Sequence, residues 1–89
     1  MKFMQVSKMK KDLTPDQQKA FAKELKHFYS TPPADLTVAA DYVAVDESCS
    51  FTLLEVHSLE RLHEINKPFA PYVDYEVFEV RPASSEKEG

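Results

Sequence analysis

The stretch 67–80, KPFAPYVDYEVFEV, constrains the fold of this chain more than any other part of it. Pro68 and Pro71 fix their own φ angles and disfavour helical backbone in the residues before them, so we expect a helix to end here and an extended strand to begin. The strand has β-favouring residues on both faces, namely Tyr72, Val73, Tyr75, Val77, Phe78 and Val80. A strand that is apolar on both faces is covered on both, and in so short a chain we expect the second cover from another subunit.

Length and composition limit the classes of protein to which the chain can belong. Its 89 residues make one domain, and a domain of this size buries only about 60 to 65% of its unfolded surface, so oligomerisation would stabilise it. A hydrophobic content of 43% excludes a disordered chain. No apolar run reaches the roughly 20 residues of a membrane helix, and the start, MKFMQVSKMKK, lacks the features of a signal peptide. We therefore expect a cytoplasmic protein with no membrane partner.

Cysteine and glycine are too scarce for the common cofactor motifs. Cys49 is the single cysteine, which excludes an internal disulfide and a multi-cysteine zinc motif, and we expect it to be a small buried hydrophobe. The single glycine is Gly89, so the sequence contains no glycine-rich loop for a phosphate group. We predict neither a cofactor nor a metal site.

Charge is distributed unevenly along the chain. Residues 1–30 carry seven Lys against three acidic residues, a net charge of +4, whereas residues 31–80 carry two basic residues against ten acidic ones, a net charge of −8. This balance does not favour nucleic acid as a partner. Two explanations stay open: the charges lie by chance on solvated faces, or they make complementary contacts between subunits.

The order of the predicted elements defines an α+β fold. We expect strands at 3–9, 36–45, 50–57 and 73–80, a first helix that begins at Pro15 and ends before Pro32, and a short second helix after Ser58. Thr14 and Gln17 form a capping box at the start of the first helix. The order β-α-β-β-α-β is ferredoxin-like, with one antiparallel four-stranded sheet and two helices on one face. Residues 1–80 form this domain, and residues 81–89 form a polar C-terminal tail.

Three short motifs follow one another in the second half of the chain. They are Leu54-Glu55-Val56, then Ser58-Leu59-Glu60 followed by Leu62-His63, then Pro71-Tyr72 followed by Asp74 and Glu76-Val77. In this order and spacing they resemble the C-terminal half of muconolactone isomerase, and the opening MKFM is also similar to the start of that family and of a related family of small dimeric α/β-barrel proteins. The isomerases carry a histidine at the position of Met4 and a Trp-Arg pair at the position of Tyr42-Val43.

The resemblance implies a dimeric α/β barrel, in which two sheets pack face to face as a homodimer or a higher homo-oligomer. It also implies a small-molecule enzyme, a proton-shift isomerase or cyclase that acts on a small cyclic or aromatic metabolite. Two other classes use the same scaffold and stay open: a non-catalytic ligand-binding protein and a self-assembling protein. All three classes have the protein itself as a partner, and the first two add a small-molecule ligand.

Glu55 is the first candidate catalytic residue. It falls in register with Phe51 and Leu53 on an otherwise apolar strand face, where removal from water would suit a carboxyl group to proton transfer. The alternative is that the strand ends at Glu55 and that its side chain reaches water or a basic residue, Arg61 or Lys67.

Histidines and tyrosines supply the other candidates. His57 and His63 flank the start of the second helix and could act as acid or base, although each could equally pack with its ring bonded to the backbone. Tyr42, Tyr72 and Tyr75 could bind substrate through an aromatic pocket and their hydroxyl groups; alternatively, they are interface or core residues.

Overall fold

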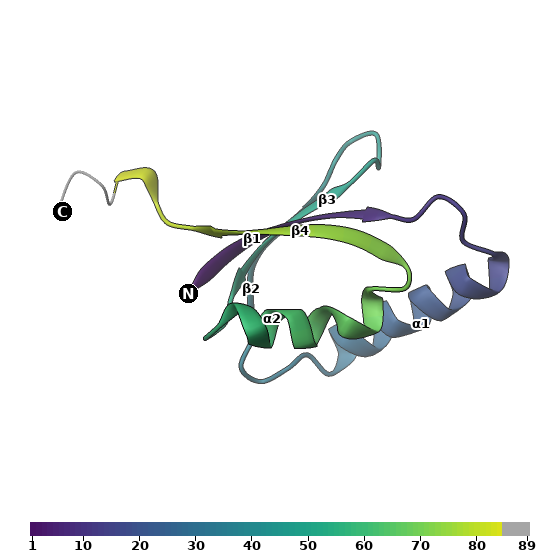
Figure 1. Cartoon of the computed structure of the whole chain (residues 1–89), viewed down its shortest axis with the longest axis horizontal. Coiled ribbons are helices and arrows are strands. Elements are labelled where there is room, and N and C mark those ends of the chain that lie inside the picture. Colours follow the sequence, from purple (N-terminus) through teal and green to yellow (C-terminus); the bar gives the residue numbers. More distant parts are fainter. Residues whose placement is uncertain (85–89) are drawn as a thin grey trace.

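The structure, a computed structural model, describes residues 1–84 and consists of one sheet with both helices on one side of it (Figure 1). Its elements are β1 (Lys2–Met9), α1 (Pro15–Ser30), β2 (Thr37–Val43), β3 (Ser50–Glu55), α2 (Leu59–Asn66), a 3-10 helix η1 (Lys67–Phe69) and β4 (Val73–Val80). This order confirms the predicted ferredoxin-like α+β fold. Residues 85–89 of the predicted tail lie outside the described part of the chain.

The sheet has the strand order β2-β3-β1-β4, and all neighbouring strands are antiparallel. β1 is therefore a central strand that pairs with β3 on one side and with β4 on the other. Phe3 lies opposite Leu54 of β3 and opposite Glu79 of β4. Because paired residues point to the same face of a sheet, this register determines which side chains face the helices.

The hydrophobic core of the described residues is small and lies beneath α2. It consists of Phe3, Leu54, Val56 and Leu62, and Leu36, Ile65 and Val77 pack against it. α1, in contrast, has no buried residue. The sheet beneath α2 is therefore well covered, whereas α1 packs only loosely against the rest of the protein.

Local sequence signals fix the starts of both helices. Thr14 Oγ1 accepts a hydrogen bond from the Gln17 backbone N–H at 3.1 Å, and Gln17 Oε1 accepts one from the Thr14 backbone N–H at 2.8 Å, which confirms the predicted capping box. Ser58 caps α2 in the predicted way, because its hydroxyl accepts a hydrogen bond from the backbone N–H of Arg61.

The two prolines near residue 70 do not act as predicted. Lys67 (φ −50°, ψ −47°) and Ala70 (φ −55°, ψ −34°) each precede a proline, yet both have helical backbone, so α2 continues directly into η1. The Ala70 backbone N–H donates to the Asn66 carbonyl at 3.1 Å and bonds with the Lys67 carbonyl at 3.3 Å. These hydrogen bonds compensate for the steric preference against helical backbone before proline, and the expectation of extended backbone was wrong.

The hairpin between β2 and β3 also differs in detail from the prediction. β2 ends at Val43 and β3 ends at Glu55, so both strands are two residues shorter at their C-terminal ends than expected. The turn begins early because the Ala44 backbone N–H bonds with the Cys49 carbonyl and Glu47 adopts a positive φ of 62°. Cys49 is half-buried, not buried as predicted, since it lies in this turn and outside the core.

The opposite side of the sheet carries no helix (Figure 1). Register assigns eight apolar or aromatic residues to this open sheet face: Met4, Val6, Ala40, Tyr42, Phe51, Leu53, Phe78 and Val80. Phe51 is 39% exposed and Phe78 is 51% exposed. No helix among residues 1–84 has the length and apolar character needed to cross a membrane.

Candidate ligand-binding cavity

A cavity of about 470 Å³ lies between the helices and the sheet. This volume falls in the range of about 300 to 1,000 Å³ that is typical of small-molecule sites. Its apolar lining includes Phe21, Leu25, Phe28, Leu36, Val38, Leu54, Leu62, Ile65 and Phe69. Its polar lining includes Gln5, Ser7, Tyr29, Asp41, Glu47, Ser50, Thr52 and Asn66. An apolar cavity with a few convergent polar groups is the usual form of a binding site.

Helix α1 forms the outer wall of the cavity. Phe21, Leu25 and Phe28 recur at helical spacing and therefore point to one side of the helix, and each is half-buried. Phe69 of η1 lies between the two helices, with its ring centroid 6.4 Å from that of Phe21 and 5.7 Å from that of Phe28. These edge-to-face contacts support α1 from the end of α2.

Two buried amide side chains form the floor of the cavity. Gln5 of β1 and Asn66 of α2 are 9% and 5% exposed, and they bond to each other in both directions. Gln5 Nε2 donates to Asn66 Oδ1 at 3.0 Å, and Asn66 Nδ2 donates to Gln5 Oε1 at 2.8 Å. Asn66 Nδ2 also donates to the Leu62 carbonyl, and Gln5 Nε2 also donates to Ser7 Oγ. The pair thus joins the central strand to α2 without an unsatisfied N–H group.

A β-bulge in β2 places a carboxylate in the cavity. Val38 pairs with Leu54 and Ala40 pairs with Leu53, so the intervening Ala39 has no partner of its own. The extra residue shifts the alternation of side chains by one position. Asp41, which pairs with Thr52, consequently faces the helices.

Asp41 connects α1 to the sheet. The Tyr29 hydroxyl donates to Asp41 Oδ2 at 3.0 Å, and the Thr52 hydroxyl donates to Asp41 Oδ1 at 3.1 Å. Burial raises the pKa of Tyr29, and the hydrogen bond and negative charge of Asp41 raise it further. The phenol therefore stays protonated at neutral pH and continues to donate to Asp41.

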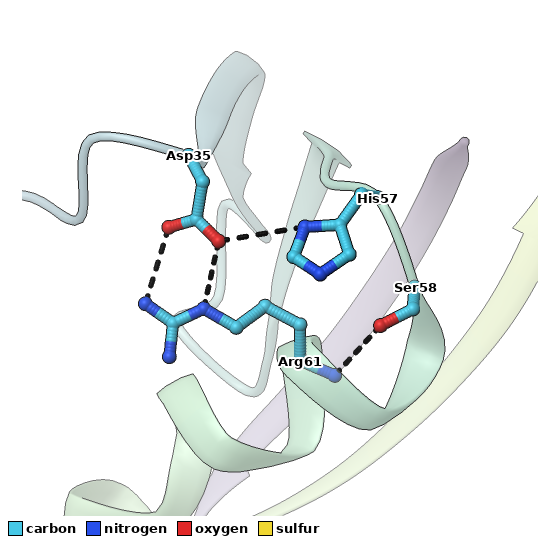
Figure 2. A network of polar contacts seen from close by, with 4 residues as sticks. All are labelled: Asp35, His57, Ser58 and Arg61. Carbon is cyan, nitrogen blue, oxygen red and sulfur yellow. Dashed lines mark hydrogen bonds and ion pairs between the residues drawn. The ribbon is translucent and has the colours of Figure 1, made fainter.

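A second polar cluster lies outside the cavity, at the start of α2. Arg61 Nε and Nη2 donate to Asp35 Oδ2 and Oδ1 at 2.7 and 3.1 Å, as Figure 2 shows. His57 Nδ1 lies 3.6 Å from Asp35 Oδ2, although its side chain is 67% exposed. The hydrogen bonds from Arg61 lower the pKa of Asp35. The cluster fastens the segment between α1 and β2 to the second helix.

The predicted catalytic residue Glu55 lies on the open sheet face, away from the cavity. Its pairing with Lys2 places it on the same face as Leu53 and Phe51, which confirms the predicted register. Its carboxylate is 4.0 Å from Lys2 Nζ and is 43% exposed. The basic residue beside it is therefore Lys2, while Arg61, one of the two neighbours considered from sequence, binds Asp35.

Of the other predicted site residues, His57 lies in the cluster with Asp35, and the remaining four are divided among three places. His63 and Tyr75 lie together on the helix side, with His63 Nδ1 3.0 Å from the Tyr75 hydroxyl. Tyr72 packs against Phe21, with ring centroids 5.7 Å apart. Tyr42 of the edge strand β2 is among the residues that border the cavity, although its pairing with Phe51 places it on the open sheet face. Tyr42 is thus the one candidate from the sequence among the described residues of the cavity wall, and the candidates do not converge on a single centre.

Sequence reasoning missed the polar residues that the cavity brings together. Gln5, Asn66 and Asp41 were not predicted to have a role, although a glutamine within an apolar strand and an asparagine at the end of an amphipathic helix were available as signals.

Residues 1–84 contain no group of three or more His, Cys, Asp or Glu side chains placed to hold a metal ion.

The fold and the cavity together define a small α+β protein with a ligand-sized space on the helix side of its sheet. A family model described as a domain of unknown function (DUF3303) matches residues 1–88, and the chain belongs to this family. A search of curated proteins finds no match to the chain. The family description names no reaction, so the muconolactone isomerase activity implied by the sequence motifs stays a prediction.

The lowered pKa of Asp35 predicts an acid-sensitive contribution to stability. Because Asp35 binds protons less readily in the folded chain, its contribution is full above the ordinary Asp pKa and is lost as the pH falls through the lowered folded value. We expect the free energy of unfolding, measured by urea denaturation between about pH 5 and pH 2, to fall more steeply in the wild type than in Arg61→Gln. Lys67→Gln, which removes a charge that has no contact with Asp35 among those described, should follow the wild type. Equal slopes in all three proteins would contradict the assignment.

Proposed function

We propose that this protein binds a small aromatic or apolar molecule in the cavity between α1, α2 and the sheet. The observation that carries the proposal is the cavity itself, a ligand-sized space with an apolar wall and a polar floor. A chain whose role is only to assemble would gain stability by filling that space, because close-packed side chains add dispersion contacts that an open cavity forgoes.

The incomplete packing of α1 supports this proposal. No residue of α1 is buried, yet Phe21, Leu25 and Phe28 all face the cavity. A ligand that occupied the space would contact these side chains and would supply the apolar surface that they lack. Part of the free energy of binding would then come from completing the core, at about 25 cal/mol per Å² of apolar surface removed from water.

Binding is better supported than isomerase chemistry. Among the residues described by the structure, the cavity lining contains no Lys, Arg or His that could hold the carboxylate of a muconolactone-type substrate. Glu55, the predicted proton-transferring group, lies on the other face of the sheet. An isomerase would therefore need a second site at Glu55 that only a covering partner could complete.

We further propose that a second copy of the chain covers the open sheet face. Apolar or aromatic residues from all four strands lie on this face, and Phe51, Phe78 and Tyr42 are exposed there. Large exposed apolar patches usually mark interaction surfaces. The described core is small and supplies little stability. Leaving the apolar residues of the open sheet face in water would therefore forgo a large share of the hydrophobic stabilisation available to the chain. A two-fold axis would bring the same face of two identical chains together, and two-fold dimers are the commonest protein oligomers, which favours an identical chain as the partner. A cytoplasmic location and the absence of nucleic-acid partners stay predictions from the sequence.

The first prediction concerns the cavity. We expect 2-phenylethanol to shift backbone amide resonances of Phe21, Leu25 and Asn66 in a two-dimensional NMR titration. Leu25→Trp, which fills the space, should weaken this binding about tenfold, since overpacking leaves no room for the ring. Lys23→Trp places the same side chain on the exposed side of α1 and should bind normally. Shifts confined to residues outside the cavity would contradict the proposal.

The second prediction concerns the partner. Sedimentation velocity should show a dimer of the wild-type protein. Phe51→Glu should dissociate it, because each interface would bury unpaired carboxylates. Leu59→Glu is the matched control, since Leu59 is 43% exposed on α2 against 39% for Phe51 but lies away from the open sheet face. A monomeric wild type, or equal effects of the two substitutions, would refute the assignment of this face.

The third prediction separates binding from catalysis. We expect no isomerisation of muconolactone above the buffer rate, because the cavity lining offers no positive group to orient the substrate carboxylate. An absorbance assay of the wild type and of Glu55→Gln tests this directly. Turnover that is lost by about a hundredfold in Glu55→Gln would establish the enzyme instead.

A further inference from the structure

We propose that the cavity selects small organic cations, namely protonated amines that carry an aromatic or aliphatic body. This inference rests on the proposed function and specifies the chemical class of the ligand. Three independent features of the lining support it: the sign of its charge, its free hydrogen-bonding capacity and its aromatic rings.

The charge of the lining is negative. Asp41 and Glu47 are its carboxylates, and the described lining residues include no Lys, Arg or His. The partners of Asp41 are the neutral hydroxyls of Tyr29 and Thr52, and none of the ion pairs found in residues 1–84 involves Asp41. The charge of Asp41 is therefore not neutralised by a side chain of the described structure. A cationic ligand would neutralise it, whereas an anionic ligand would be repelled.

The hydrogen-bonding capacity left in the cavity floor is that of an acceptor. The Leu62 carbonyl can only accept, so its bond from Asn66 Nδ2 fixes the orientation of the Asn66 amide and, through it, that of Gln5. Both N–H groups of each amide are then used within the protein. Each amide oxygen accepts one hydrogen bond from the other amide and keeps a second lone pair. A ligand at this floor would therefore donate, as an ammonium group with three N–H bonds does.

Two aromatic rings of the cavity lining, those of Tyr29 and Phe28, lie on the Asp41 side of the cavity. The hydroxyl of Tyr29 is bonded to Asp41, and the Tyr29 ring lies 5.3 Å from that of Phe28. Rings of this kind attract a cation over their faces and pack against an apolar ligand body. The lining thus offers both halves of an amphipathic amine a matching surface.

The test compares three probes that share a phenyl body and differ in charge. These are 2-phenylethylamine, which is protonated at neutral pH, 2-phenylethanol, which is neutral, and 3-phenylpropionate, which is an anion. NMR titrations at one ionic strength should give the tightest binding for the amine, at least about tenfold tighter than for the carboxylate. Because this ranking uses the wild-type protein, it does not depend on the folding of a variant.

Substitution of Asp41 tests whether its carboxylate causes the preference for the amine over the alcohol. Asp41→Asn keeps the side-chain shape and should reduce the preference for the amine over the alcohol to within about twofold. Asp12→Asn is the matched control: Asp12 is exposed in the loop between β1 and α1 and is outside the cavity lining, so the preference should be unchanged.

Each outcome has a separate meaning. If 3-phenylpropionate binds the cavity as tightly as the amine, the selectivity for cations is refuted and the proposed binding function stands. If the amine is preferred equally in wild type and Asp41→Asn, the role of Asp41 is refuted. If none of the probes shifts resonances of the cavity residues, both the selectivity and the proposed function are refuted.

Discussion

The reciprocal hydrogen bonds between Gln5 and Asn66 are the interaction on which the helix side of this protein depends. They join β1, the central strand, to the last residue of α2, immediately beside the buried Leu62. Removing one amide would leave the other buried without its hydrogen-bond partner, which would lower the free energy of unfolding by about 1–3 kcal/mol. Because α2 continues without a break into η1, the position of Asn66 also sets the position of Phe69, and the ring of Phe69 supports α1. The amide pair therefore positions both the floor and, indirectly, the wall of the cavity.

The bulge in β2 determines which polar group joins this floor. In a regular strand, Ala40 and Tyr42 would share the helix side with Val38, and the cavity would lack the Asp41 carboxylate. The unpaired Ala39 exchanges the two faces beyond it, so that Asp41 reaches Tyr29 and Tyr42 pairs with Phe51 on the open sheet face. One inserted residue thus adds the Asp41 carboxylate to the cavity and also changes which residues lie on the opposite surface.

The parts of the fold that were predicted from sequence have local signals. Thr14 with Gln17, Ser58, and the alternation around Glu55 involve residues close together in the chain, and the structure confirms them. The cavity depends on contacts without such signals. Gln5 and Asn66 are 61 positions apart, and the bulge at Ala39 follows from a register that neither strand specifies alone. The backbone before Pro71 was mispredicted for a different reason, since local hydrogen bonds from the Ala70 backbone N–H to Asn66 and Lys67 outweighed the steric preference.

We propose separate roles for the two faces of the sheet: the helix side for a small molecule and the open sheet face for a second chain. The most direct test of the first role is a crystal structure determined with 2-phenylethanol at saturating concentration. We expect electron density for the phenyl ring in contact with Phe21, Leu25 and Leu54, with its hydroxyl group next to the amides of Gln5 and Asn66. A structure in which α1 has moved onto the sheet and its side chains fill the space, with the alcohol absent or elsewhere, would contradict this proposal.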